Sequence, residues 1–332
     1  MRKRFFSKLA IVMSTALAVS GCFCPIDKAF VNAETIQDED DSYYDDSTDD
    51  SYDDSTDDSY DDSTDDSDNE ETTGTKIDDV KLSSSELQAF VKESDSDENG
   101  YISQSEAEKI TYVSISKKAS QSDLTQIIKL YPNISELMWN AGTLTKLTFP
   151  KNNIKRLNIT SKAASQLVIS GINQKLNNLS YTAQGSKKYA FNFAKGSAYK
   201  KVEDFNLMGK QINGVKLSNA EVGTLYVTDT SAKKIDASSD KIINLWVQNN
   251  KKLSSFTVRN CSKLKSVSCA YNALSRLNIS GCPKLLSVSC DRNKLTKLDI
   301  SKYKNLKSIS CGQNKLKKFD ISKNKKLISV YC

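Results

Sequence analysis

The sequence predicts a β-rich solenoid of stacked turns, preceded by a small helical segment. First, apolar side chains recur with a period of 21 through the last third of the 332-residue chain. Second, charge is divided along the chain: Glu34 to Thr73 holds 20 acidic residues and no basic one, whereas Ala107 to Cys332 holds 39 basic and 12 acidic residues, a net charge of +27. Third, the chain has no histidine, which excludes catalysis that needs an imidazole base.

Residues 1–33 have the features of an export signal. Met1–Lys8 is cationic, and Leu9–Ser20 is an apolar stretch too short to span a bilayer stably. Two processing sites stay open. Residues 19–22 resemble a bacterial lipobox in which Cys22 would be acylated, and Val31-Asn32-Ala33 resembles an ordinary signal-peptidase site. The apolar stretch ends at the lipobox, which favours the first. Either route predicts a protein that is secreted or held at the cell surface, with membrane attachment only through a lipid anchor.

Residues 34–75 form an acidic spacer. The octad YDDSTDDS begins at Tyr44, Tyr52 and Tyr60, and aliphatic residues are almost absent. Such a segment cannot bury enough apolar surface to offset its ordering entropy, so we expect it to be disordered and extended.

Residues 76–112 are expected to form an EF-hand-like helix–loop–helix that binds one structural calcium. A calcium loop requires oxygen ligands at alternating positions, a central glycine for the sharp turn, here Gly100, and a final bidentate glutamate. The predicted ligands are Asp95, Asp97, Asn99, the carbonyl of Tyr101, Ser103 and Glu106. Ile102 should pack inward.

The flanking residues agree with this loop. Ser83 and Glu86 have capping-box spacing for an entering helix over Ser83–Lys92, which would carry Leu87, Phe90 and Val91 on one face. Ser105–Lys109 can begin the exiting helix. Only one such loop is visible, although EF-hands usually occur in pairs.

Residues 113–332 repeat with the pattern L-x-x-V-x-C-x-x-N-x-L-x-x-L-x-I-S. Each turn can bury its apolar side chains only against the next turn, so the turns must stack. The equivalent positions include Leu264, Leu285, Leu306 and Leu327, and Cys269, Cys290, Cys311 and Cys332. A buried asparagine at each strand end should bond the backbone of the bend and of its neighbours. Residues 172–201 break the register and suggest a hairpin insertion around Tyr189–Phe193.

This pattern resembles the leucine-rich repeat, most closely the bacterial subclass with a nested 10+11 period in which both half-turns form strands. The resemblance covers residues 113–332. The calcium loop ahead of the repeats also resembles secreted leucine-rich repeat proteins of gut Gram-positive bacteria. The resemblance implies binding of other macromolecules rather than chemistry. The chain departs from the pattern at Cys332, in mid-turn and without a polar capping repeat, which suggests truncation or pairing with a partner or another copy.

The repeat cysteines are expected to be a ladder of free thiols that fill inward positions. In-register parallel neighbours are expected to be poorly placed for a disulfide. A disulfide between Cys261 and Cys282, which occupy equivalent places in consecutive turns, stays open. Without C-x-x-C spacing or histidine, zinc is not expected.

The candidate binding surface combines a flat hydroxyl face with a basic column. It consists of Ser287, Ser289, Ser308, Ser310, Arg276, Lys297 and Lys318. Together with the lysines of the turns, it predicts binding to an anionic polymer such as a cell-wall polymer or host mucin. No aromatic stacking platform is evident in the sequence, so nucleic acid ranks last.

The sequence therefore predicts a surface-displayed or secreted adhesion protein without enzymatic activity. The alternative is a structural envelope protein that docks on its own cell wall.

Overall fold

The computed structural model describes residues 73–217 and 220–332. The predicted export signal, the lipidation candidate Cys22 and the acidic spacer as far as residue 72 lie outside the described residues. In the part of the chain that is described, no helix has the length and apolar content needed to cross a membrane.

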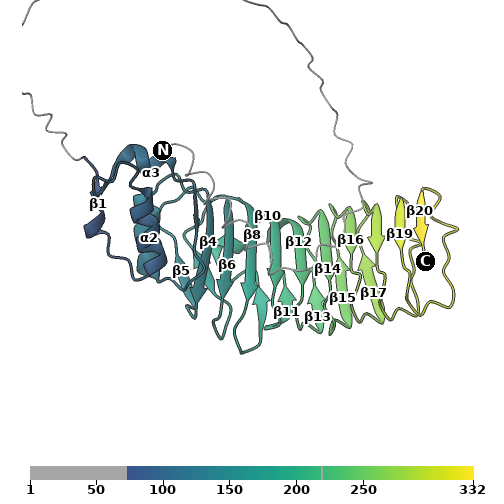
Figure 1. Cartoon of the computed structure of the whole chain (residues 1–332). Coiled ribbons are helices and arrows are strands. Elements are labelled where there is room, and N and C mark those ends of the chain that lie inside the picture. The colour runs from purple at the N-terminus through teal and green to yellow at the C-terminus, as the bar shows by residue number, and fades with distance from the viewer. Residues whose placement is uncertain (1–72, 218–219) are drawn as a thin grey trace, which may run out of the picture. The chain divides into compact units, whose positions relative to one another are not determined.

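Parallel strands stack side by side in chain order and form one large sheet (Figure 1). This sheet has 11 strands in the order β20-β19-β18-β16-β14-β12-β10-β8-β6-β4-β3, and we call it the main sheet. Its strands are β3 (Tyr112–Ser114), β4 (Glu136–Gly142), β6 (Arg156–Ser161), β8 (Leu176–Ala183), β10 (Lys201–Met208), β12 (Glu221–Thr228), β14 (Asn244–Gln248), β16 (Ser266–Ser268), β18 (Ser287–Ser289), β19 (Ser308–Ser310) and β20 (Ser329–Tyr331).

The other half of each turn forms a second parallel sheet across the core. Its five strands are β9 (Tyr189–Asn192), β11 (Ile212–Lys216), β13 (Lys234–Asp236), β15 (Ser255–Arg259) and β17 (Arg276–Ser280). Nearer the N-terminal end, β5 (Lys146–Thr148) and β7 (Val168–Ser170) pair with each other. In the last two turns the equivalent segments, 297–300 and 318–321, form no strand.

Strand register confirms the predicted solenoid. Val267, Val288, Ile309 and Val330 are successive partners across the main sheet, so the register reproduces the period read from the sequence. Apolar side chains from both sheets are buried in one continuous core, since each strand turns every second side chain inward. The fold is a leucine-rich-repeat-like β-solenoid.

The hairpin predicted within residues 172–201 is wrong. Tyr189–Asn192 is the first strand of the second sheet, and its partner, β11, is parallel to it. The turn is longer than its neighbours. Leu179 pairs with Phe205, whereas a turn of ordinary length would pair it with a residue near position 200. The short 3₁₀ helix η3 (Ser197–Tyr199) lies within it. The extra length is absorbed by a buried aromatic cluster, whose rings meet edge-on or tilted: Tyr181, Phe191, Phe193, Tyr199 and Phe205.

The predicted asparagine column is confirmed. The Asn293 side chain donates to the carbonyls of Cys269 and Cys290, and its oxygen accepts the Leu274 N–H at 3.0 Å. Asn314 repeats this arrangement one turn later, with bonds to Cys290, Cys311 and Leu295. Each side chain thereby links consecutive turns at a place where the backbone bends out of the ladder.

Helices cover the N-terminal end of the solenoid. They are α2 (Ser85–Ser94), α3 (Gln104–Lys109) and α4 (Gln121–Leu130), preceded by the 3₁₀ helix η2 (Ile77–Asp79). The N-cap of α2 is Ser84, which accepts the Leu87 N–H, so the predicted capping role of Ser83 is wrong. The Ser83 hydroxyl donates instead to the buried Asp123 carboxylate of α4. The helix α4, which was not predicted from the sequence, buries Leu124, Ile127 and Ile128.

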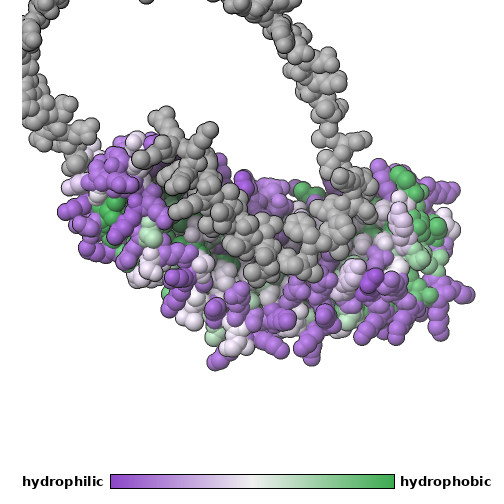
Figure 2. Space-filling view, in the orientation of Figure 1, coloured by the Kyte–Doolittle hydropathy of each residue, from purple (hydrophilic) through white to green (hydrophobic). Residues whose placement is uncertain are grey.

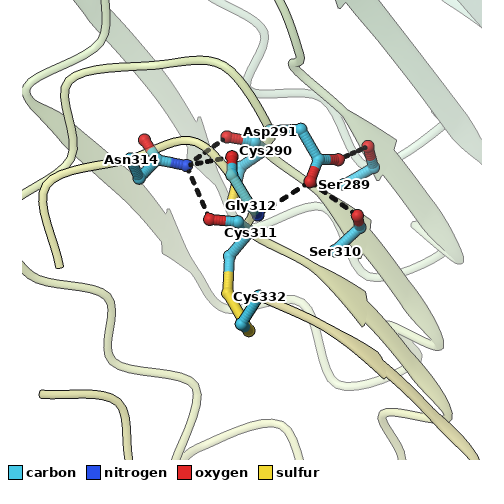
Figure 3. The surroundings of a disulfide bond; sticks show 8 residues. All are labelled: Ser289, Cys290, Asp291, Ser310, Cys311, Gly312, Asn314 and Cys332. Carbon is cyan, nitrogen blue, oxygen red and sulfur yellow. Dashed lines mark hydrogen bonds between the residues drawn. A yellow bond between two sulfur atoms is a disulfide. The ribbon is translucent and has the colours of Figure 1, made fainter.

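The prediction of a wholly reduced cysteine ladder is also wrong. A disulfide joins Cys311 and Cys332 (Figure 3). Cys269 and Cys290 are free and buried. Each cysteine directly follows one of the adjacent parallel strands β19 and β20, and the two α-carbons lie 4.7 Å apart, inside the range that a disulfide spans.

The last turn exposes apolar side chains. Hydrophobic residues gather at the end of the molecule where β19 and β20 lie (Figure 2). The exposed side chains there are Ile321, Ile328, Val330 and Tyr331, and Ile328 is 80% exposed. No following turn among the described residues covers them.

Candidate functional site

Three carboxylates converge in the loop between α2 and α3. Ligand oxygens of Asp95, Asp97 and Glu106 lie within 4.8 Å of one another, so this cluster could hold a metal ion. Asp95 and Glu106 are buried and Asp97 is exposed. The loop closes because Gly100 adopts a φ of +85°, which other residues rarely tolerate.

Hydrogen bonds hold the two buried carboxylates in place. Asp95 accepts the N–H groups of Asn99 and Gly100, the latter at 2.9 Å. Glu106 accepts the N–H and hydroxyl of Ser96 on one oxygen and those of Ser103 on the other. Burial opposes the charge of Glu106, but these four donors outweigh it and lower the pKa of Glu106 to about 2. Glu106 is therefore an anion at any physiological pH, as a metal ligand must be.

The other predicted ligands lie around this cluster in different roles. The Asn99 side chain donates to Asp97 at 3.0 Å and accepts the Tyr101 N–H at 2.8 Å. Ser103 is the N-cap of α3 and forms a capping box with Glu106. The Asn99 N–H favours the Asp97 carboxylate, but the neighbouring Asp95 and Glu106 outweigh it and raise the pKa of Asp97. A bound cation would relieve this repulsion between carboxylates.

A short strand pairs with the backbone of this loop. β1 (Thr75–Lys76) runs antiparallel to β2 (Tyr101–Ile102), with Thr75 opposite Ile102. Ile102 is buried, as predicted. The single loop therefore has its backbone partner within the same chain.

The structure separates the predicted binding surface into two parts. Ser287, Ser289, Ser308 and Ser310 belong to β18 and β19 of the main sheet. Arg276 begins β17 of the second sheet, and Lys297 and Lys318 are exposed at the equivalent places of the last two turns. The cationic column and the hydroxyl face are therefore not one continuous surface.

Aspartates beside the serine face and beside the basic column hold turns of the backbone in place. Asp291 accepts the hydroxyls of Ser289 and Ser310 and the Gly312 N–H (Figure 3). Asp299 accepts the Ser301 N–H at 2.9 Å, and the hydroxyl and N–H of Ser301 together lower the pKa of Asp299. These carboxylates organise turns, which leaves the adjacent cations unpaired.

Sequence reasoning missed an aromatic pair on the main sheet. Tyr226 of β12 and Trp246 of β14 are strand partners, and their rings stack at an interplanar angle of 14° with centroids 6.1 Å apart. Trp246 is 37% exposed. The two residues are 20 positions apart, and only the strand register brings them together. The repeat period predicted that register, so aligning outward positions as well as inward ones would have found them.

Cys261 and Cys282 are free and buried. Hydrogen bonding between the two thiols lowers the pKa of Cys261 and raises the pKa of Cys282. The disulfide that the sequence left open is therefore not formed here.

No protein-family model and no curated protein matches the chain. Among solved structures, the chain is similar to the functional domain of InlJ from Listeria monocytogenes, which is described as including a cysteine ladder. The identity is 17%, the TM-score is 0.38, and the match covers 73% of this chain and 58% of that one, less than two thirds of its length. It is also similar to an internalin, InlF, from L. monocytogenes strain 4b F2365, with 13% identity, a TM-score of 0.31 and coverage of 78% of this chain and 98% of that one.

Proposed function

We propose that this chain is an exported, surface-displayed or secreted binding protein that attaches to an anionic extracellular macromolecule. The observation that carries the proposal is the unpaired charge of the last turns. Residues 261–332 hold 16 Lys and Arg and only three Asp. The four ion pairs found among the described residues all involve residues before Cys261. Unpaired exposed cations in regular array attract polyanions and steer their approach.

The Cys311–Cys332 disulfide supports an extracellular location, because such bonds persist in oxidising compartments. A rigid, repetitive surface also suits recognition of a repetitive ligand. We therefore favour a cell-wall polymer or a sulfated or sialylated mucin, and we propose no catalytic role.

We further propose that the loop from Asp95 to Glu106 binds one calcium ion as an EF-hand-like site. The carboxylate cluster, the turn at Gly100 and the low pKa of Glu106 support this assignment. Calcium would neutralise the carboxylates and stabilise the helices that cover the solenoid.

Co-sedimentation of the purified full-length protein with isolated Gram-positive cell walls, and separately with mucin, tests the binding proposal. We expect binding at low salt that falls steeply at high salt. The triple variant Arg276→Gln, Lys297→Gln, Lys318→Gln should bind more weakly. The matched control Lys187→Gln, Lys188→Gln, Lys195→Gln removes the same charge from exposed sites elsewhere and should bind nearly as the parent does.

The outcomes separate the two functions. Binding to mucin but not to walls supports adhesion, and binding to walls alone supports the structural envelope role. Absence of binding to both at low salt, or equal losses in the two triple variants, would contradict the role of the basic column.

A further inference from the structure

The stacked Tyr226 and Trp246 form an exposed aromatic platform on the outward face of the main sheet. Their sequence neighbours Leu225, Val227, Leu245 and Val247 are all fully buried, so the alternation of the strands turns both rings outward. Trp139, the other tryptophan of the chain, is buried at 2% exposure. A contiguous aromatic patch exposed on the face of a sheet is a candidate interaction site.

The side chains around this platform are polar, and apart from one carboxylate at its margin they are uncharged. The register positions beside and across from the two rings are Asn206, Thr224, Thr228, Asn244, Gln248 and Ser268. Their hydroxyls and amides supply both donors and acceptors. Asn244 donates to Thr224 at 3.4 Å, and Gln248 donates to Ser268, so the group is already ordered. Asp204, the partner of Thr224, contributes one carboxylate at its margin.

This chemistry distinguishes among ligand classes. A nucleic acid would need cations beside the stacking rings, and the positions around the platform carry none. The anchors of a protein hot spot lie in a well-packed, fully desolvated pocket, whereas this pair is partly exposed on a sheet face among amides and hydroxyls that offer hydrogen bonds to a ligand. A sugar ring presents polarised C–H groups on one face, which the electron-rich face of an aromatic ring attracts, and hydroxyls at its rim.

We propose that the Tyr226–Trp246 platform binds an uncharged glycan chain, with a sugar ring stacked on Trp246 and its hydroxyls bonded by the surrounding amides and hydroxyls. The neutral platform is complementary to a neutral ligand, while the lysine-rich turns serve an anionic one. The inference goes beyond the proposed polyanion binding and does not depend on it, because the two surfaces use different residues.

Affinity electrophoresis of the full-length protein in gels that contain galactomannan, mannan, xyloglucan or dextran tests this proposal. We expect retardation by at least one of these neutral polysaccharides, and we expect it to persist at high salt because no charge is involved. Trp246→Ala should weaken the affinity for the polysaccharide by about tenfold or more, and Tyr226→Ala should weaken it by less. The control Tyr271→Ala removes an exposed tyrosine from a turn outside the sheet and should leave the affinity unchanged.

Tryptophan fluorescence supplies a second readout that needs no variant. Binding should shift the emission of Trp246 to shorter wavelength and shield it from acrylamide, while buried Trp139 stays constant. The proposal is overturned if none of the four polysaccharides retards the protein, if Trp246→Ala is retarded as strongly as the parent, or if only polyanions or proteins cover Trp246. Salt-sensitive binding that survives Trp246→Ala would support the basic surface alone, so the two proposals fail separately.

Discussion

Cys311 and Cys332 occupy equivalent positions in consecutive turns and are joined by a disulfide, with α-carbons 4.7 Å apart. The bond lies in the same inward column as the free thiols of Cys269 and Cys290. It links β19 to the turn that exposes Ile328 and Tyr331. One covalent bond therefore anchors the turn that has the least apolar cover.

Cys332→Ser should loosen this last turn. Closing a 21-residue loop stabilises a chain by about 3 kcal/mol in the entropic account. We expect faster proteolysis after Lys325 and Lys326 and a lower midpoint of thermal unfolding. Cys269→Ala, which removes a thiol of the same column without opening a loop, is the control. Equal proteolysis of the parent and Cys332→Ser would contradict the anchoring role.

Asn293→Ala should destabilise the solenoid by about 1–3 kcal/mol, the cost of one buried polar group left unsatisfied. It leaves the buried N–H of Leu274 without its partner. The carbonyls of Cys269 and Cys290 each lose one bond but still accept from another asparagine of the column. Urea unfolding measures the loss. The exposed Asn278→Ala should change the free energy of unfolding by less than about 0.5 kcal/mol. Similar losses of unfolding free energy in both variants would show that the asparagine column does not contribute to stability.

Asp123 should make stability depend on pH. Burial alone would raise its pKa, but the bonds from Ser83 and Ser120 outweigh burial and lower it. A carboxyl with a lower pKa in the folded state stabilises the fold above its unfolded value of about 4, and this stability is lost as pH falls through the folded pKa. The difference in unfolding free energy between the parent and Asp123→Asn should therefore shrink as pH falls below about 4.

The exposed Glu93→Gln serves as the control for this experiment. Its difference from the parent should stay nearly constant over the same pH range. A difference between the parent and Asp123→Asn that does not change with pH would rule out the proposed linkage.

Calcium should raise the thermal stability of the protein. A ligand at 100 times its dissociation constant stabilises the folded state by about 2.7 kcal/mol. Glu106→Gln removes the final carboxylate of the cluster and should abolish the shift, as measured by differential scanning calorimetry with calcium and with chelator. Glu108→Gln, an exposed change on the same helix, should retain the calcium-dependent rise in thermal stability. An equal calcium effect in both variants would place the ion elsewhere.

Much of the fold could be predicted because each turn repeats its neighbour. The period of 21 predicted which side chains are buried, which residues pair between strands and where the asparagines bond. The cluster of Asp95, Asp97 and Glu106 could be predicted in the same local way, since all three residues lie within one short loop and the start of the next helix. One error falls where the period changes: the long turn from Leu179 to Phe205 reads as an insertion until its aromatic side chains are seen to fill the core. Another, the disulfide between Cys311 and Cys332, falls where the period is regular.

The sequence by itself determined the solenoid, the position of the carboxylate loop and the division of charge, because these follow from local spacing and composition. Only the tertiary structure decided which of the side chains brought near one another bond, stack or stay apart. It paired Cys311 with Cys332, placed Ser83 on Asp123, stacked Tyr226 on Trp246 and separated the serine face from the basic column. Each of the three contacts depends on distances of a few ångströms between residues about 20 or more positions apart. Such distances are set by strand register and by the packing of helices on the solenoid end.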